Sequence, residues 1–531
     1  MKIYYSELNF DTDISTELLF LKNGHCWILL PLTNQMSRYF GLTVYNQRKA
    51  YRLLDKINFF KDIEKIFIHS PHHLFLVNQN QRTHFFIKKD GFLISSSSRY
   101  PINLTFDARD IFNTSQQNRD IKIEPKDKNF VKAFWFIENE LIFEADIISK
   151  DLIKINNQWQ KNFMSYDAKR NSPPYEFYSF DGLQTETSYL EFKIIKPKLP
   201  INLQPFKSSN HTLINFLLHR LNHCFLNEYL PAGFPWFFER WYRDELVSLF
   251  FLKHFLKEGW FEVFIDDYLN LDKDLFFAKE KGALAADVIL WLINLMPQEK
   301  VLEHQIKLKS LFENWLKIFY PNQTLIVPEK ATWMDTIYRP KPIEISALLI
   351  KSFQKLGFKQ LYLKEKKELQ KRLFEIAKEN VSDANEYIEL YRPNIFLVYQ
   401  LLPNLFLKPV WRKILWEVYE KIKLTWGGLA SLATDLDNFQ WIHTGENPKS
   451  YHNGDSWHFL NILAAKTFFE LKEDYLGNKI LKSVIESLLK LGTPGYLSEL
   501  SDAKMLSAQG SPIQIWSMAT LVNLLDYLNY K

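Results

Sequence analysis

Short runs of alternating apolar and polar residues fill the N-terminal part of the chain. The runs are rich in Ile, Phe, Tyr, Val and Thr, and turns that contain Asn, Gly or Asp separate them. Among them are KIYYSEL, HCWILLPL, IEKIFIHS, THFFIKK, ELIFEADII and YLEFKII. In the apolar stretch 17–32, the sequence Lys-Asn-Gly-His at 22–25 interrupts the run and predicts a hairpin. Repeated short strands with tight turns are typical of a β-sandwich, which we predict for residues 1–200.

The alternating pattern ends between residues 194 and 210, where three prolines occur. From residue 211 the apolar residues recur with the 3.6-residue period of a helix, and positions 213, 214, 217, 218, 221 and 225 share one face. The same period predicts helices over 244–257, 260–270, 283–295, 300–318, 343–356, 361–379, 409–421, 456–471, 474–490 and 511–528. Strands and helices do not alternate, so we predict a multidomain β + α protein in which a β domain precedes a helical domain.

Composition narrows the classes of function. The 531 residues include 47% hydrophobic residues, enough for large cores, and the formal net charge of +5 is small. Because acidic and basic residues are interspersed, a nucleic-acid partner is not expected. Cys26 and Cys224 lie far apart in the sequence and offer neither a metal-ligand spacing nor a disulfide framework. The N-terminus lacks the pattern of a secretory signal and no run of 18 apolar residues occurs, so we expect a cytoplasmic protein without a membrane partner.

The segment GFPWFFERWYRDEL, residues 233–246, combines aromatic rings with charged groups. A pyranose has an apolar face that stacks on aromatic rings, and a rim of hydroxyls that pairs with carboxylate and guanidinium groups. Trp236, Trp241, Arg243 and Asp244 are therefore candidate sugar-binding residues. The alternative is structural, because aromatic clusters commonly form cores and an Arg–Asp pair at a helix start is often a cap or a local ion pair.

Five blocks of the sequence, in the same order, resemble motifs of the amylo-α-1,6-glucosidase (glycogen debranching enzyme) family. They are Gly-Phe-Pro-Trp-Phe with Trp-Tyr-Arg-Asp within 233–244, Thr-Trp-Met-Asp and Pro-Ile-Glu-Ile-Ser-Ala-Leu within 332–348, Arg-Pro-Asn at 392–394, Tyr-His-Asn-Gly-Asp-Ser-Trp at 451–457, and Ser-Glu with Gln-Ile-Trp-Ser within 498–517. SRYFGLTV at 37–44 and LTFDARD at 104–110 resemble elements of the N-terminal β-supersandwich of these enzymes. The resemblance implies that an (α/α)6 toroid of the glucoamylase-like type covers residues 205–531 and contains the catalytic site.

The resemblance also implies roles for single residues. Asp335 would be the general acid and Glu499 the general base, while Arg243 and Asp244 would hold the hydroxyls of the terminal glucose. A carboxyl group flanked by Trp333 and Met334 is expected to be desolvated, which favours the protonated form that an acid needs. The structural alternative is that Asp335 caps a turn.

Four further residues are candidates for contact with the sugar. Trp333 and Trp457 offer rings on which a sugar can stack, and Glu344 would lie beside the substrate or support the groups that do. Glu344 also follows Pro342 at a predicted helix start, a position that favours an acidic residue on its own account. His452 is expected to make hydrogen bonds rather than bind a metal, because no second ligand follows at metal-binding spacing.

The other motif residues have structural predictions. Arg392, Pro393 and Asn394 are expected to form a turn whose polar groups order a loop, and Gly454 to let the backbone approach the sugar. No metal and no cofactor are implied, because a pair of carboxyl groups is sufficient for glycoside hydrolysis.

The resulting hypothesis is an inverting glycoside hydrolase that acts on α-glucan and releases glucose from α-1,6-linked branch stubs. A glucoamylase-like or trehalase-like α-glucosidase is one alternative, and a non-catalytic glucan-binding scaffold is another. The presence of both Asp335 and Glu499 argues against the scaffold. The oligomeric state is not predicted.

Overall fold

The computed structural model describes residues 2–13, 18–33, 35–58, 63–78, 81–112, 118–200, 203–226 and 228–529. Two compact units are present. Unit 1 comprises residues 1–230 and 488–496, and unit 2 comprises residues 231–487 and 497–531. The predicted boundary at 194–210 contains Ile201 and Asn202, which lie outside the described residues.

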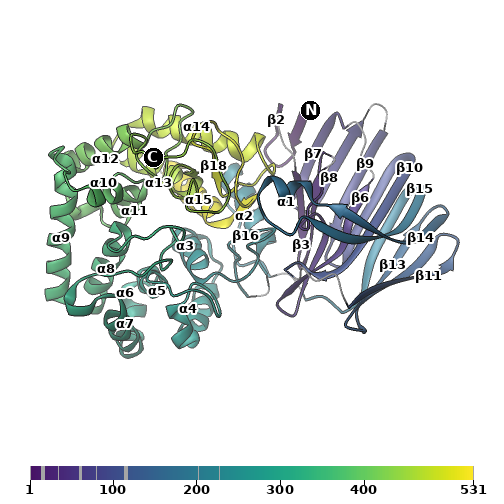
Figure 1. The fold of residues 1–531 in the computed structure, drawn as a ribbon, viewed down its shortest axis with the longest axis horizontal. Helices are drawn as coiled ribbons and strands as arrows, with labels where there is room; N and C mark the ends of the chain where they lie inside the picture. The colour runs from purple at the N-terminus through teal and green to yellow at the C-terminus, as the bar shows by residue number, and fades with distance from the viewer. Residues whose placement is uncertain are drawn as a thin grey trace. The chain divides into compact units, whose positions relative to one another are not determined.

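Unit 1 is built on β-strands (Figure 1). The strands are β1 (Lys2–Tyr5), β2 (Phe10–Asp13), β3 (Leu18–Asn23), β4 (Cys26–Pro31), β5 (Gly41–Asn46), β6 (Lys49–Asn58), β7 (Lys65–Ser70), β8 (His73–Asn78), β9 (Gln81–Lys88), β10 (Gly91–Asp110), β11 (Arg119–Asp127), β12 (Phe130–Ile137), β13 (Glu140–Ser149), β14 (Ile153–Phe163) and β15 (Glu176–Lys196). Two helices accompany them, α1 (Ser165–Lys169) and α2 (Thr212–Cys224). The predicted hairpin is confirmed, because β3 pairs antiparallel with β4 from Leu18–Pro31 to Asn23–Cys26.

The two longest strands, β10 and β15, join two arrays of strands. They pair with each other along most of their length. The first half of β10 pairs with β9 and its second half with β6, while β15 pairs with β14 through its first half and with β13 through its second. The inner faces of the arrays meet, since Trp135 of β12 donates a hydrogen bond to the carbonyl of Leu53 in β6 at 3.2 Å. The ring of Trp135 also lies 5.7 Å from that of Phe106. Strands β10 and β15 are therefore shared by two facing layers of strands, and an apolar core lies between these layers.

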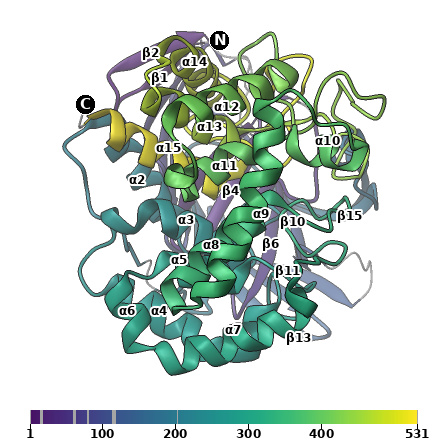
Figure 2. The ribbon, with the colours of Figure 1, turned by 90° about the vertical axis from the view of Figure 1, so that its left-hand side faces the viewer.

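Unit 2 is mainly helical (Figure 2). Its helices are α3 (Tyr242–Leu252), α4 (Trp260–Leu271), α5 (Val288–Leu295), α6 (Gln298–Glu303), α7 (Gln305–Phe319), α8 (Ile343–Leu356), α9 (Lys359–Ala377), α10 (Ala384–Leu390), α11 (Asn394–Leu401), α12 (Lys408–Ile422), α13 (His458–Glu470), α14 (Asp474–Lys490) and α15 (Ile515–Asn529). Short 3-10 turns are η1 (Lys253–Phe255), η2 (Asp272–Phe276), η3 (Pro321–Gln323) and η4 (Pro403–Leu405). Two pairs of very short strands occur in its loops, β16 (Gly233–Phe234) with β19 (Ile513–Gln514) and β17 (Ser456–Trp457) with β18 (Leu500–Ser501).

Six helices of unit 2 form a closed ring of neighbours within the described residues. Helix α3 packs against α5, α5 against α8, α8 against α11, α11 against α13, α13 against α15, and α15 returns to α3. These helices are buried on nearly all sides, as a helix that is apolar around its whole circumference must be. Helices such as α7, α9 and α12 bury one face only, and α9 packs against α8 and α12 outside the ring.

Helix α8 matches the predicted range in full, residues 343–356. Pro342 precedes it, and Gly357 ends it with a φ of +84°, a left-handed conformation that glycine adopts without strain. The predicted helix 300–318 is wrong in one respect, because His304 separates α6 from α7. The predicted helix 283–295 begins only at Val288.

The late starts of three predicted helices share one physical reason. The N–H groups just before each helix find partners outside it. Ala286 donates to the carbonyl of Ala331 at 2.8 Å, which keeps residues 283–287 out of α5. The residues before α13 and α15 pair instead as the short strands β17 and β19, so these helices begin at His458 and Ile515 rather than at 456 and 511. Helices α10 and α11 were missed by the sequence prediction.

None of the helices in the described residues combines the length and the apolar character that a membrane crossing requires.

Candidate active site

A cavity of about 430 Å³, including its open mouth, lies in unit 2 where several ring helices begin. Its lining comes from the segments that lead into α3, α8, α13 and α15. The lining residues are Ala232, Phe237, Trp241, Arg243, Asp244, Trp333, Asp335, Tyr451, Trp457, Glu499, Gln514 and Trp516. The ring of helices thus holds residues from four distant stretches of sequence around one space.

The start of α3 supplies a charged wall of the cavity. Arg243 is buried and donates through Nε to Oδ2 of Asp287, which precedes α5, at 2.5 Å. Burial raises the pKa of the neighbouring Asp244 to about 7, although the charge of Arg243 acts to lower it. The carboxylates of Asp287 and Asp335 add to the increase. Asp244 can therefore donate as well as accept a proton in a hydrogen bond near neutral pH.

The loop before α8 presents Asp335 to the cavity. Trp333 and Met334 turn their side chains inward and are buried, whereas the side chain of Asp335 is 44% exposed. The expectation that the two apolar neighbours desolvate this carboxyl group was therefore wrong. Adjacent residues in the loop point in different directions, so Trp333 and Met334 do not cover the Asp335 side chain although they flank it in the sequence.

Glu499 lies in the opposite kind of environment. Glu499 is only 3% exposed. It accepts a hydrogen bond from the hydroxyl of Tyr451 at 2.5 Å and another from the N–H of Ser511 at 2.9 Å. Burial raises the pKa of Glu499 to about 8, and the negative charge of Glu446 contributes, while the two hydrogen bonds act to lower it. Gly510 must lack a side chain here, because a Cβ atom at its φ of +65° would overlap the Glu499 carboxyl group.

Aromatic rings form the floor of the cavity. The ring of Trp333 meets that of Trp457 edge to face at 5.2 Å and that of Trp516 at 6.4 Å. Trp457 is fixed by a hydrogen bond from its Nε1 to the carbonyl of Tyr451 at 2.8 Å. Three indole rings at one site provide stacking surface, which is part of the chemistry that sugar rings require.

His452 differs from the expected hydrogen-bonding residue. The residue is fully buried, its ring stacks on that of Trp457 at 5.1 Å, and neither ring nitrogen has a hydrogen-bond partner among the described residues. Oδ1 of Asp335 lies 3.8 Å from Nε2 of His452. Burial lowers the pKa of His452 to about 4, so the ring is neutral at neutral pH.

Glu344 belongs to a buried ion-pair network instead of the cavity lining. Arg339 donates to both oxygens of Glu344, at 2.6 and 2.8 Å, and to both oxygens of Glu389, at 2.6 and 2.8 Å. Burial acts to raise the pKa of Glu344, but the charge and hydrogen bonds of Arg339 outweigh it and hold the pKa below its usual value. The network ties the loop before α8 to α10 just behind the cavity.

The prediction for the Arg-Pro-Asn segment is confirmed for its arginine. Arg392 is buried at the start of α11 and donates to the carbonyls of Ser431 and His452 at 2.7 and 2.6 Å. It therefore orders two loops, one of which carries Tyr451 and His452. Gly454 has a different role from the predicted one, because a Cβ atom there would overlap the carbonyl of Gln440, so this glycine serves packing of backbone on backbone.

Seven of the residues singled out in the sequence line the same cavity: Trp241, Arg243, Asp244, Trp333, Asp335, Trp457 and Glu499. Three do not line it, namely Trp236, Glu344 and His452. Trp236 is buried with its ring 6.4 Å from that of Phe237, and Phe237 reaches the cavity. Phe237, Tyr451, Gln514 and Trp516 also line the cavity but were not predicted as site residues. A signal existed for each of them, since all four stand in the quoted motifs.

Among the described residues, no group of three or more His, Cys, Asp and Glu side chains is arranged to hold a metal ion. Cys26 and Cys224 are buried as free thiols.

Comparisons with known proteins give a match to one family model over part of the chain and several distant structural likenesses. The sequence model of the amylo-alpha-1,6-glucosidase family matches residues 306–523. No curated protein matches the chain.

Solved structures resemble the chain at low identity. A GH63 mannosylglycerate hydrolase from Thermus thermophilus, in complex with Tris and D-glycerate, is 12% identical with a TM-score of 0.42, covering 59% of this chain and 100% of that one. An uncharacterized conserved protein from the same organism is 12% identical with a TM-score of 0.41, covering 59% and 99%. A rhamnosidase from Klebsiella oxytoca with rhamnose bound is 10% identical with a TM-score of 0.42, covering 81% and 88%.

Proposed function

Residues 306–523 belong to the amylo-alpha-1,6-glucosidase family, and from this premise we propose that the protein releases glucose from α-1,6-linked branch stubs of an α-glucan. The protein is a glycoside hydrolase. The observation that carries the finer proposal is the placement of Asp335 and Glu499 in one cavity with aromatic rings and an ion-paired arginine.

The reaction needs one proton donor and one proton acceptor on the two sides of the glycosidic bond. Asp335 gives its proton to the glycosidic oxygen as the bond to the anomeric carbon breaks. A water molecule attacks that carbon from the opposite face and gives its proton to Glu499, so the product has inverted configuration. Substrate that covers Asp335 displaces water from its exposed carboxyl group.

The other lining residues hold the sugar. Trp241, Trp333 and Trp516 line the cavity and supply aromatic rings on which a sugar can stack. Arg243 and Asp244 bind hydroxyls of the glucose being released, and the ion pair of Arg243 with Asp287 fixes the guanidinium group for that purpose. An α-glucan is therefore the proposed partner, with no nucleic acid, membrane or cofactor involved, and the cytoplasm the proposed location.

The chain order of the helices supports an (α/α)6 toroid over residues 205–531. Apart from the short helices α6 and α10, the ring helices α3, α5, α8, α11, α13 and α15 alternate along the chain with α4, α7, α9, α12 and α14, which is an order of successive helix pairs. The two joined strand arrays support the proposal that residues 1–200 form a β-supersandwich domain.

Glucose release from four substrates tests the proposal. Purified protein is offered branched limit dextrin, panose, linear maltooligosaccharides and trehalose, in parallel with Glu499→Gln. The glutamine keeps the size of the side chain and cannot take a proton, so we expect at least about a hundredfold loss of kcat. Release of β-glucose from the branched substrates, seen by NMR at early times, supports an inverting debranching enzyme.

The alternatives give other patterns. Cleavage confined to linear substrates or trehalose indicates a glucoamylase-like or trehalase-like enzyme. Binding of glucan without any cleavage indicates a scaffold, and wild-type turnover by Glu499→Gln refutes the role of that residue.

A further inference from the structure

An exposed tryptophan stands on a loop next to the cavity. The side chain of Trp441 is 49% exposed, although an indole ring buries a large apolar area when it packs in a core. Its neighbour Ile442 and Met505 of the loop after Glu499 are also exposed, at 59% and 61%. Exposed apolar side chains that gather in one place indicate a binding surface.

The position of Trp441 is fixed from both sides. Its carbonyl accepts a hydrogen bond from the N–H of Lys504 at 2.9 Å. One residue earlier, Gln440 donates to the carbonyl of Asn453 at 2.8 Å. The ring of Trp441 packs edge to face on the buried ring of Phe439, with centroids 4.8 Å apart. The indole is thus presented in one orientation at small cost in conformational entropy.

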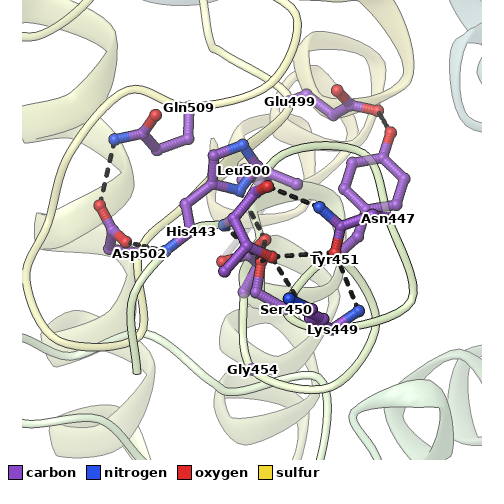
Figure 3. A network of polar contacts seen from close by, with 12 residues as sticks. His443, Asn447, Lys449, Ser450, Tyr451, Gly454, Glu499, Leu500, Asp502 and Gln509 are labelled. Atoms are coloured by element: carbon purple, nitrogen blue, oxygen red, sulfur yellow. Dashed lines mark hydrogen bonds and ion pairs between the residues drawn. The ribbon is translucent and has the colours of Figure 1, made fainter. Parts of the chain in front are cut away.

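The loop that carries Trp441 is linked to the residues around Glu499 (Figure 3). The N–H of His443 donates to Oδ1 of Asp502 at 2.5 Å, and Nδ1 of His443 lies 2.7 Å from Oδ2 of the buried Asp455. Asp502 also accepts from Gln509 at 3.1 Å. His443, which follows Trp441 by two residues, therefore joins the segment before α13 to the loop that follows the proposed base.

The chain limits how far this surface lies from the reacting bond. Asp502 follows Glu499 by three residues, so their Cα atoms are at most about 11 Å apart. Trp441 precedes His443, whose N–H donates to Asp502, by two residues. When the terminal glucose of a polymer occupies the cavity, the rest of the polymer has to extend out through the mouth of the cavity. Trp441 belongs to the loops beside Glu499.

We propose that Trp441 stacks on a glucose ring of the α-glucan that lies beyond the two rings joined by the cleaved bond. The substrate is then a branched polymer that Trp441 contacts at a glucose ring away from the cleaved bond, rather than a free disaccharide. This inference rests on the proposed function of the cavity. A rigid exposed ring face next to a sugar site binds the apolar face of a pyranose, and it discriminates by chain length because short substrates do not reach it.

Trp441→Ala tests the inference, with Trp416→Ala as the matched control. Trp416 is 47% exposed on α12 and belongs to the same unit, so it controls for the loss of an exposed indole. We expect Trp441→Ala to lower kcat/KM for branched limit dextrin about five- to twentyfold and to leave that for isomaltose within about twofold. Trp441→Phe keeps a ring and is expected to retain most of the activity on limit dextrin. An equal loss on both substrates, or no loss on limit dextrin, overturns the inference.

A binding assay keeps the inference separate from turnover. Electrophoresis through a native gel that contains glycogen retards a protein that binds the polymer. Weaker retardation of Trp441→Ala than of wild type and Trp416→Ala supports the outer site, even if the wild type releases no glucose and the proposed function fails. Equal retardation of the three proteins, or none in the wild type, overturns it.

Discussion

The hydrogen bond from Tyr451 to Glu499 offers a test of how the protonation of the proposed base is controlled. Replacing Tyr451 by Phe removes the hydroxyl that donates to the carboxylate at 2.5 Å and keeps the ring contacts with His452 and Trp457. The bond stabilises the charged form of Glu499, so its loss raises the pKa from the value of about 8. A base acts only when deprotonated, and kcat/KM therefore rises with pH through the pKa of Glu499 in the free enzyme.

The size of the shift follows from the strength of the bond. A hydrogen bond to a charged group contributes about 1.5–3 kcal/mol, and one pKa unit corresponds to about 1.4 kcal/mol. We expect the rising limb of kcat/KM to move from near pH 8 to about pH 9–10 in Tyr451→Phe. At pH 7 the variant should be about 10- to 100-fold less active, while its activity at the high-pH plateau approaches that of the wild type.

The assay is glucose release from limit dextrin at low substrate concentration across the pH range, with circular dichroism to confirm that the variant stays folded. An unshifted rising limb would refute the reasoning about the Tyr451 hydrogen bond. If kcat/KM instead fell with increasing pH near 8, and Tyr451→Phe moved that fall to higher pH, Glu499 would be the acid and the two carboxyl roles would be exchanged.

Two further substitutions test the supports of the site. Gly510→Ala forces a side chain against the Glu499 carboxyl group at a positive φ, and we expect about a hundredfold loss of kcat, since a displacement of about 1 Å of a catalytic group costs that much; wild-type kcat would contradict this. Arg339→Met leaves the buried carboxylates of Glu344 and Glu389 without their cation, and we expect the free energy of unfolding in urea to fall by about 3–5 kcal/mol. A decrease below about 1 kcal/mol would show that the network is not needed for stability.

The sequence predicted those elements whose ends are marked by local chemistry. The range of α8 was correct at both ends because Pro342 and Gly357 are strong start and stop signals. The hairpin of β3 and β4 was predicted because polar residues interrupt an apolar run. The missed helices α10 and α11 are short, and Pro393 between them reads as a turn. The break at His304 has no local signal, because both sides of it continue a helical pattern.

For the site, motif order identified residues that meet in space, but not which way each side chain points. Trp236 and Phe237 are adjacent, and Trp236 was predicted to bind sugar, but only Phe237 lines the cavity. The exposure of Asp335 depends on the loop conformation, and the role of Glu344 depends on Arg339 and on a helix that was not predicted. Such orientations follow from long-range packing, which periodicity along one chain does not contain.

The closure of the helical ring has a consequence for the synthesis of the protein. Helix α3 is the first ring helix to leave the ribosome, and its final neighbour α15 is the last. Glu499 and Trp516 also arrive with this last segment, whereas Arg243 and Asp244 are made more than two hundred residues earlier. Until α15 has been made, the surface of α3 that α15 covers in the folded protein has no partner, and exposed apolar surface of this kind favours aggregation. Glu499 and Trp516 therefore join the other lining residues of the cavity only after this last segment has been made.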